Sequence, residues 1–394
     1  MVTLTTADKA LKSVYLGVLT NQFNINTNPL FAKIKKSSTY VTGKEVIKTA
    51  PIGINGGIGA GSEDGALPTA NGNTYVQMKQ TLKNLYGTIE ISDKAIRASQ
   101  NDAGAFVNLL NAEMDGLIKA STFNFSRMLM GNGKGYLAEL QSGTSYTAVV
   151  DTVMNIMEGM IVDVYDSSNS VIKSGYGGVK IVSINRNTKT VTFDKTVGAI
   201  TDLSDGGYYL VVQNSLDKEI FGLDGIFDTT NFTSIYGLAR SSNAWLTPVL
   251  KSSVGTLSDA VIQSGIDTVE EYYGSDIDFI TCASDVKRKY QSYLASLSRN
   301  IDIMNLEGGF KAISYAGIPV MSDRFMKSGT MYLLNSKAFT LHQLCDWEWL
   351  EGDDGTILKQ KPGYPCYSAT LVKYAELMCD QPCGQVKMSG ITIS

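Results

Sequence analysis

The alternation of apolar and polar residues marks the first clear element of the chain. Lys44–Thr49 has the character of a short strand, and a glycine-rich stretch, Gly53–Asn73, follows it. A second run then alternates over more than a dozen residues, with apolar positions at Tyr75, Val76, Met78, Leu82, Leu85, Ile89 and Ile91. Alternation with a period of two is typical of a strand with one buried face. Residues 44–91 are therefore expected to form a long two-stranded hairpin with the glycine-rich stretch at its tip.

The predicted tip has an unusual composition. Six glycines fall within Gly53–Gly65, around the acidic pair Glu63 and Asp64, and Pro68 comes shortly afterwards. An isolated two-stranded hairpin is at best marginally stable in water. The sequence therefore predicts that another surface covers this hairpin.

A helical period replaces the alternation after residue 102. Asp102 is a suitable N-cap, and glycine residues at Gly131 and Gly133 supply a C-terminal stop. Between them, apolar residues form one stripe at Phe106, Leu110, Met114, Leu117, Ile118, Phe125 and Leu129. Residues 103–130 are thus predicted to form one rod, roughly 43 Å long at ~1.5 Å per residue. Its stripe is expected to face a sheet that contains Trp347, Trp349 and Leu371.

The rest of the chain divides into segments with different residue patterns. Short β-branched and aromatic runs separated by turn residues predict a small barrel or sandwich, preceded by the linker QSGTSYT, and inserted into a host domain. The host then shows helical patterns at about 248–273 and 284–298, with a short strand between them, and ends in a β-rich portion. A short helix at 8–20 precedes an extended arm. The predicted division is 1–43 for helix and arm, 44–91 for the hairpin, 92–147 for the long helix, 148–219 for the insertion, 220–335 for the α/β part and 336–394 for the closing sheet.

Composition narrows the class of protein. The chain has 394 residues, and 34 basic residues nearly balance 38 acidic ones. This balance argues against a dedicated nucleic-acid binder and against a polybasic membrane-surface protein. No apolar stretch approaches the roughly 20 residues of a membrane span, and the N-terminus has no signal-peptide pattern. An odd number of cysteines at irregular spacing predicts reduced thiols in a cytosolic setting.

Candidate catalytic residues are few. The only histidine, His342, lies in an apolar strand-like run and is expected to be a packed or half-exposed strand residue rather than a general base. Cys379 and Cys383 lack the second pair or nearby histidine that a zinc site needs, so they are expected to be incidental thiols near a turn. The glycine runs lack the context of a phosphate-binding loop. The sequence predicts a protein that is not an enzyme and has no cofactor or metal.

Taken in order, these segments resemble the major capsid proteins of tailed bacteriophages with the HK97 fold. The hairpin followed by KNLYGTIEISDKAIRAS is similar to that family's extended loop, which runs into the peripheral domain and its spine helix. GGFKAISYAGIPVMSDRFMKSGTMYLLN resembles the axial-domain strands, and TLHQLCDWEWLE with ATLVKYAELMC resembles the last peripheral-domain strands. Only 148–219 falls outside the resemblance, as an inserted surface domain of the kind that some members carry.

The resemblance implies an α+β, HK97-like capsid fold with an N-terminal arm, an extended β-hairpin loop, a peripheral domain with a long spine helix, an axial domain and an inserted small all-β domain. It implies a structural subunit that forms the pentamers and hexamers of an icosahedral phage head around double-stranded DNA. Assembly would take place in the host cytoplasm, and the mature location would be the virion. The implied partners are further copies of the chain, a separate scaffolding protein, a portal, decoration proteins and packaged DNA contacted without sequence specificity. No membrane is involved.

Particular residues follow from the resemblance. The family's extended loop lies over a neighbouring subunit, which implies inter-subunit contacts at Gly57, Gly59, Glu63, Asp64, Leu67, Tyr75, Lys79 and Lys83. The two acidic residues are expected to pair with basic groups of the neighbour, or else to form a solvated tip. The core of the spine helix would comprise Phe106, Leu110, Met114, Leu117 and Ile118.

Two family features are not expected in this chain. Some members join a loop lysine to a peripheral-domain asparagine; Lys79 and Lys83 offer the amine, but no asparagine follows Asn335. A covalent cross-link of this kind is therefore not predicted. Some members also begin with a long cleaved scaffolding segment, whereas only a short segment precedes the arm here, which predicts an unprocessed N-terminus.

Other functions stay open on the sequence. An encapsulin-like bacterial nanocompartment has the same fold but encloses enzymes; the insertion and the long hairpin favour the phage head. A β-rich tail protein that binds glycans through Tyr176, Tyr208 and Tyr209 would not explain the order of hairpin, rod and sheet. An enzyme is disfavoured by the scarcity of catalytic residues.

Overall fold

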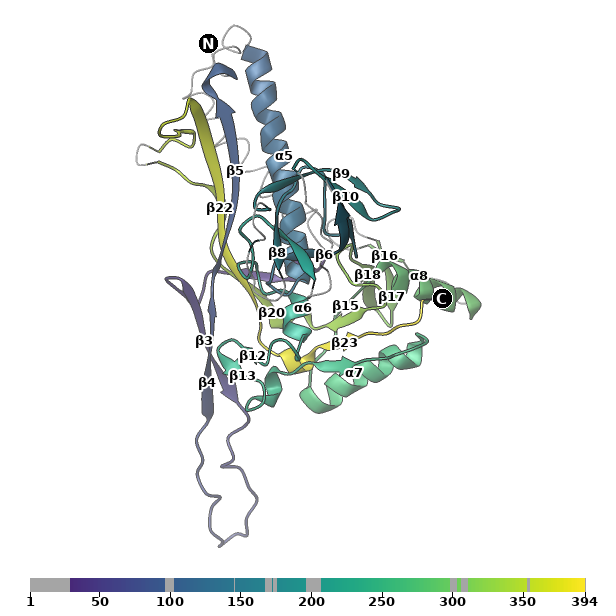
Figure 1. Ribbon diagram of the computed structural model, residues 1–394. Coiled ribbons are helices and arrows are strands. Elements are labelled where there is room, and N and C mark those ends of the chain that lie inside the picture. Colours follow the sequence, from purple (N-terminus) through teal and green to yellow (C-terminus); the bar gives the residue numbers. More distant parts are fainter. Residues whose placement is uncertain are drawn as a thin grey trace.

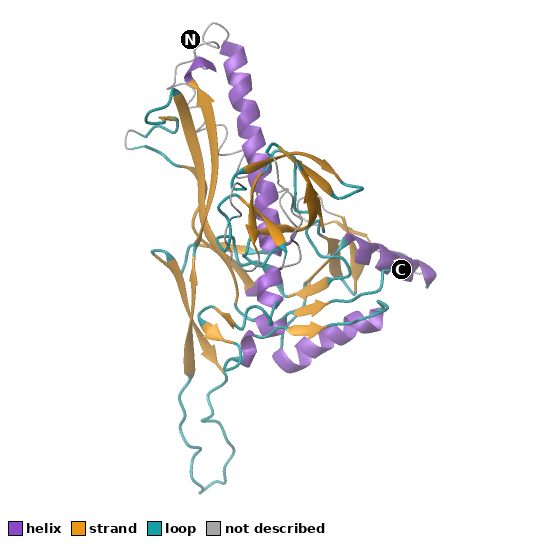
Figure 2. Cartoon of the chain, viewed as in Figure 1, coloured by secondary structure: helices purple, strands orange, loops and turns teal. Residues whose placement is uncertain are grey.

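The computed structural model describes residues 29–95, 103–144, 146–166, 172, 176–195, 207–297, 303–305, 311–352 and 355–393. The helix predicted at 8–20 and the N-cap predicted at Asp102 lie outside these residues. Helices and strands are mixed throughout the described part, and several strands far apart in the sequence lie side by side (Figures 1 and 2). The architecture is of the α+β class.

An antiparallel sheet with one long helix along it forms the upper part of the molecule in Figure 1. Its strands are β1 (Lys35–Ser37), β20 (Phe339–Trp349), β22 (Cys366–Cys379), β5 (Lys83–Ser92) and β21 (Lys359–Gln360), and only β1 pairs in parallel. The helix α5 (Ala103–Met130) has the predicted bounds. The arm contributes β1 and a short helix, α3 (Pro29–Lys33), where an extended segment was expected.

The hairpin is shorter than the alternation suggests. Strands β3 (Glu45–Ile52) and β4 (Thr74–Thr81) pair along their whole length, and β2 (Val41–Thr42) adds to β3. The following strand, β5, pairs instead with β22. The predicted hairpin end at residue 91 therefore moves to Thr81. Alternation reports only that one face of a strand is buried, and it cannot identify the strand that forms the hydrogen bonds.

The inserted module is a closed barrel with its own core. Its strands are β6 (Tyr136–Thr144), β7 (Thr147–Val150), β8 (Ile161–Asp166), β9 (Val179–Asn185), β10 (Thr190–Phe193) and β11 (Tyr208–Val212). The barrel thus begins at Tyr136, before the predicted boundary at 148. Residues 141–144 of the segment predicted to be a flexible linker form the end of β6, which pairs with both β7 and β11, and Thr147 begins β7.

A second sheet forms the lobe at the lower right of Figure 1. Its order is β14-β23-β19-β15-β18-β17-β16, and helices α7 (Asp259–Tyr273) and α8 (Ser284–Ser296) accompany it. The strands are β14 (Val249–Lys251), β15 (Phe279–Cys282), β16 (Ile303–Asn305), β17 (Lys311–Tyr315), β18 (Ile318–Ser322), β19 (Met331–Leu334) and β23 (Val386–Met388). The helix predicted from 248 begins only at Asp259. Residues 249–251 instead pair with β23 near the end of the chain, a partner that local periodicity cannot reveal.

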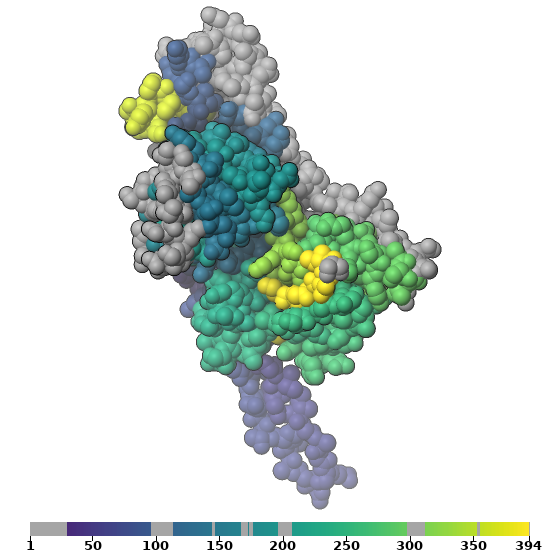
Figure 3. All heavy atoms as spheres, turned by 45° about the vertical axis from the view of Figure 1, so that its right-hand side comes forward, coloured from purple at the N-terminus to yellow at the C-terminus, as the bar shows by residue number. Residues whose placement is uncertain are grey.

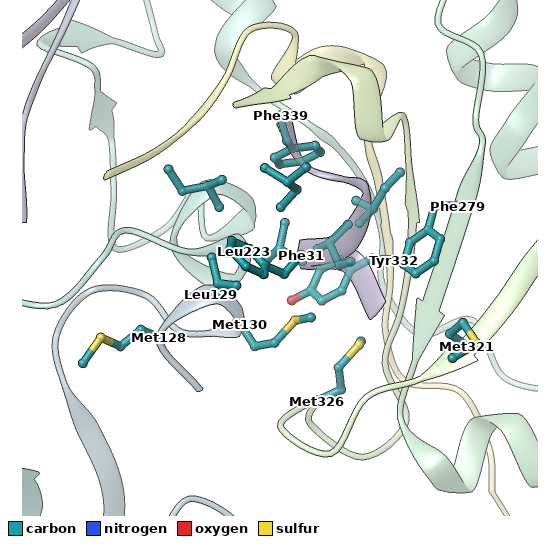
Figure 4. Packing of buried hydrophobic residues seen from close by; sticks show 14 of the residues in the cluster. Phe31, Met128, Leu129, Met130, Leu223, Phe279, Met321, Met326, Tyr332 and Phe339 are labelled. Carbon is teal, nitrogen blue, oxygen red and sulfur yellow. The ribbon is translucent and has the colours of Figure 1, made fainter. Parts of the chain in front are cut away.

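The two sheets share one hydrophobic core. It joins the last turn of α5 to α6 (Leu223–Phe227), to α3 and to strands of the second sheet, and Figure 4 shows part of it, with Met130, Leu223, Phe279 and Tyr332 among the labelled residues. Because side chains from both sheets interdigitate there, the two lobes are held as one packed body. The barrel and the hairpin are the additions to this body.

Candidate assembly surface

The tip of the hairpin carries the most exposed large apolar side chains among the residues that the structure describes. Gly53–Asn73 forms a loop without strands, which we call the projecting loop, and Figure 3 shows it extending away from the body. Ile54, Ile58 and Leu67 expose 89%, 84% and 90% of their surface. Three large apolar side chains that are almost fully exposed on one short loop are typical of an interaction site. Their position at the end of a projection makes contact with another molecule the simplest explanation.

The chemistry of the projecting loop is acidic as well as apolar. Glu63 and Asp64 are both exposed, and the loop contains no lysine or arginine. A partner surface would therefore be apolar with basic groups near it.

Glycines hold the two limbs of the projecting loop close together. A Cβ added to Gly59 would lie 3.1 Å from Cγ of Pro68, and one added to Gly57 would lie 3.4 Å from the amide nitrogen of Asn71. The amide of Gly57 also donates a 2.9 Å hydrogen bond to Oδ1 of Asn55. Neither glycine needs a left-handed backbone. They serve close approach across the loop, which fixes its shape.

The base of the hairpin is anchored on its own subunit. Val46 and Met78 are buried with Tyr236 and Leu246, and the amide of Lys79 donates a 2.9 Å hydrogen bond to the carbonyl oxygen of Tyr236. The hairpin therefore has a small core at its base, and only its outer part lacks one. The side chain of Lys79 itself is exposed.

The other two candidate contact residues lie away from the tip. Tyr75, at the outer end of β4, exposes 60% of its surface. Lys83 lies on β5, and its Nζ donates a 2.8 Å hydrogen bond to the carbonyl oxygen of Asp217 at the exit of the barrel. The structure thus brings the glycines, the acidic pair and Leu67 together on the projecting loop, but not Lys83.

A buried carboxyl group lies where the hairpin joins the body. Glu376 of β22 is fully buried, and its Oε1 accepts hydrogen bonds from the amides of Phe221 (2.8 Å) and Leu377 (3.0 Å). Its Oε2 accepts one from Nε2 of Gln80 on β4 (3.3 Å). Burial raises the pKa of this carboxyl group from 4.5 to about 7, although these hydrogen bonds and the charge of Lys83 oppose the rise. The only signal in the sequence was an acid placed between apolar neighbours, Ala375 and Leu377.

The spine helix packs on the sheet through part of its apolar stripe. Met114, Ile118 and Phe125 are buried, and the ring of Phe125 meets that of Trp347 edge-on at 6.5 Å. Leu117 is only half-buried. Phe106 and Leu110 lie on the helix, but their side chains are outside the described residues.

Leu117 packs against the backbone of Gly87 in the sheet. A Cβ added to Gly87 of β5 would lie 2.8 Å from Cδ1 of Leu117, and Gly87 is paired with Leu371 of β22. The glycine therefore lets α5 approach the strands closely at this position.

Two ion pairs, one fully buried and one with a half-buried carboxylate, join the elements around the helix. Arg127 of α5 forms a bidentate pair with Glu219, which follows the barrel; Nη1 lies 2.8 Å from Oε2, and both side chains are 4% exposed. Lys373 of β22 pairs with Asp346 of β20, which also accepts a 3.3 Å hydrogen bond from Lys36 of β1. Breaking a buried pair leaves one charge uncompensated, so these pairs fix the arm and the barrel exit on the body. Nothing local in the sequence pointed to either pair.

The candidate catalytic residues are packed into the structure. His342 is a buried strand residue whose Nδ1 lies 3.3 Å from the carbonyl oxygen of Thr39, and burial lowers its pKa. Cys379 and Cys383 are buried free thiols beside the turn at Pro382–Gly384. Among the described residues, no group of three or more His, Cys, Asp or Glu side chains is placed to hold a metal ion. None of the described helices has the length and apolar character needed to cross a bilayer.

Comparison with solved structures identifies the fold. No family model matches the sequence, and no curated protein matches it. Among solved structures, the capsid asymmetric unit of cyanophage A-1(L) is similar over 95% of this chain and 93% of that one, with a TM-score of 0.52 and 11% identity.

Two other solved structures align over similar lengths. The capsid of a native GTA particle gives a TM-score of 0.47 at 10% identity over 93% of this chain and 91% of that one. The SrpI encapsulin complex of Synechococcus elongatus gives 0.46 at 8% identity over 94% and 90%.

The chain therefore has the fold of a phage capsid subunit, of the HK97-like type. In these terms the hairpin is the extended loop, the sheet with α5 is the peripheral domain, and the lobe with α7 and α8 is the axial domain. At this level of identity the likeness establishes the fold alone.

Proposed function

We propose that this chain is the major capsid subunit of a tailed phage, and that it self-assembles into the pentamers and hexamers of an icosahedral head around double-stranded DNA. The observation that carries the proposal is the projecting loop. Its apolar side chains are almost fully exposed in the single subunit, while the base of the same hairpin is packed. Burial on a neighbouring copy would explain why both features occur on one element.

Energetics support a repeated contact of modest strength. Fully burying an Ile or Leu side chain is worth about 1.5–3 kcal/mol, and three such residues lie on the projecting loop. Ordering the interface and associating two molecules cost a large part of that gain. A closed shell repeats the contact many times, so a weak individual contact is sufficient and leaves assembly errors reversible.

The partners follow from this function. A separate scaffolding protein, a portal and decoration proteins would act with the subunit, and packaged DNA would be contacted without sequence specificity. The near-neutral charge of the chain supports weak rather than tight contact with DNA. The inserted barrel and the long hairpin favour a phage head over an encapsulin-like compartment.

Deletion of residues 55–71 tests the proposal. The full chain, expressed together with the scaffolding protein, is expected to form closed shells in electron micrographs. The deletion variant is expected to remain soluble and folded, because the core at the hairpin base is untouched, but to form no closed shells or only fragile ones. Normal shells with normal heat resistance from the variant would refute the role of the loop. Absence of shells from the full chain with scaffold present would refute the proposed function.

A further inference from the structure

The two helices of the axial lobe carry opposite charge. From Ser252 to Val286 the chain has no lysine or arginine but seven acidic residues, Asp259, Asp267, Glu270, Glu271, Asp276, Asp278 and Asp285. The next three residues are Lys287, Arg288 and Lys289, on α8. The acidic segment includes the whole of α7 and ends in the first turn of α8, so the change of sign falls between Asp285 and Lys287.

Part of the acidic charge is used inside the subunit. Asp278 accepts hydrogen bonds from the amide and hydroxyl groups of Ser336, and Asp285 accepts one from the hydroxyl of Ser328. Asp259 accepts a 3.1 Å hydrogen bond from the hydroxyl of Tyr290. These residues hold the lobe together.

The charges at the end of α7 have no such use. Glu270 and Glu271 are exposed, and neither forms an ion pair with another described residue. Beside them, Tyr272 exposes 74% of its surface and Tyr273 41%, with their rings 6.4 Å apart. The end of α7 is therefore an exposed acidic and aromatic face. We call it the α7 face.

A complementary face lies on α8. Arg288 is exposed, Lys287 is half-buried, and neither is ion-paired within the described part of the subunit. We call these residues, with Lys289, the α8 face. Figure 1 shows α7 along the lower margin of the lobe and α8 at its right-hand end. Two complementary faces on separate margins of one lobe suit a head-to-tail contact, which gives a ring when the rotation between successive copies closes.

We infer that the α7 face of one subunit docks on the α8 face of the next copy in the ring. The occupant is a second copy because the complementary charge is present on this same chain. Arginine and tyrosine are the residues that most often dominate interfaces, and a guanidinium group stacks favourably on a tyrosine ring. Arg288 of one copy would therefore contact Tyr272 of the next, with Glu270 and Glu271 opposite the lysines. This inference rests on the ring assembly proposed above and names the surfaces that would form it.

Charge exchange between the two faces is the test. Glu270→Lys with Glu271→Lys makes both faces basic, and Lys287→Glu with Arg288→Glu makes both acidic. Each double variant is expected to lower the yield of closed shells by at least about tenfold, because like charges oppose each other across every contact in the ring. The quadruple variant restores the match with exchanged signs, and its yield is expected to return to within about twofold of the unmodified chain.

The control for the Glu270/Glu271 variant is Glu113→Lys with Asp115→Lys on the exposed side of α5, which makes the same change of net charge elsewhere. Circular dichroism on every variant establishes that the subunit is folded. Unchanged shell yield in either double variant overturns the inference, and so does a quadruple variant that fails like the doubles. Both results require that the unmodified chain forms shells, so they are distinct from a failure of the proposed function.

Discussion

Replacement of Glu376 by glutamine should change how the free energy of unfolding depends on pH. The carboxyl group is fully buried at the junction of β22, β4 and Phe221, and its pKa is raised to about 7. In the unfolded chain the same group titrates near 4.5. Between these two values the folded state binds one proton more than the unfolded state.

The sign follows from linkage between proton binding and folding. Where the folded state holds the extra proton, the free energy of unfolding falls as pH rises. The contribution of Glu376 is therefore fully present below pH 4.5 and is lost by about pH 7. At about 1.36 kcal/mol per pH unit, the interval corresponds to about 3.4 kcal/mol.

Glutamine keeps the shape of the side chain and does not titrate. Its carbonyl oxygen can still accept the hydrogen bonds of Phe221 and Leu377, and Gln80 can turn its own carbonyl toward the new amide. We expect Glu376→Gln to be similar to the unmodified chain at pH 5 and more stable at pH 8, so that the difference between the two proteins grows by about 2.5 kcal/mol across this range.

Urea denaturation followed by tryptophan fluorescence measures this difference. All three tryptophans, Trp245, Trp347 and Trp349, lie outside the barrel, so the signal reports the body of the subunit. His342, whose pKa burial lowers, contributes a slope of opposite sign below about pH 6.5, but it is present in both proteins and cancels in the comparison. Glu113→Gln, at an exposed position, is the control. Parallel pH profiles for the unmodified chain and Glu376→Gln would show that the reasoning about this carboxyl group is wrong.

Two further predictions concern the barrel and the spine helix. The carbonyl oxygen of Lys134 accepts a 3.2 Å hydrogen bond from the amide of Asp217, so the two ends of the barrel meet. Replacing residues 135–216 with a short Gly/Ser linker should therefore leave a soluble subunit with a cooperative thermal transition. An insoluble product would mean that the barrel is part of the host core. Leu117→Asp places a carboxylate against Gly87 and should lower the free energy of unfolding by about 2 kcal/mol or more. Asp115→Ala, on the exposed side of the helix, should lower it by less than about 0.5 kcal/mol. Equal melting temperatures for these two variants would contradict the packing of the helix on the sheet.

The sequence predicts the elements of this fold better than their partners. The bounds of α5 follow directly from its long apolar stripe and glycine stop, because both signals are local. The pairing of β5 with β22, and of β14 with β23, joins segments that lie far apart in the sequence. Periodicity shows which face of a strand is buried but carries no information about its neighbour, and so the hairpin was predicted too long and the helix at 259 too early.

The candidate site shows the same limit. Glycines and acidic residues of the projecting loop could be identified by composition, since few other functions explain them. Glu376, Arg127 and Glu219 could not, because an isolated acid or base in a sequence is usually exposed. Their burial depends on contacts between β22, α5 and the segment after the barrel, which exist only once the chain is folded.

The close approach of the two limbs in the projecting loop bears on how such a loop can act in assembly. Fixing the backbone of one residue costs roughly 1 kcal/mol or more, so ordering the whole of Gly53–Asn73 on contact would exceed the gain from burying three side chains. A loop that is already shaped avoids most of this cost. Gly59 allows that shape because a side chain there would press on Pro68 of the opposite limb, and a side chain at Gly57 would crowd Oδ1 of Asn55, which accepts the Gly57 amide hydrogen bond. The anchored base of the hairpin then determines where the loop points. The glycines are therefore better understood as shaping the loop before contact than as leaving it free to adapt during contact.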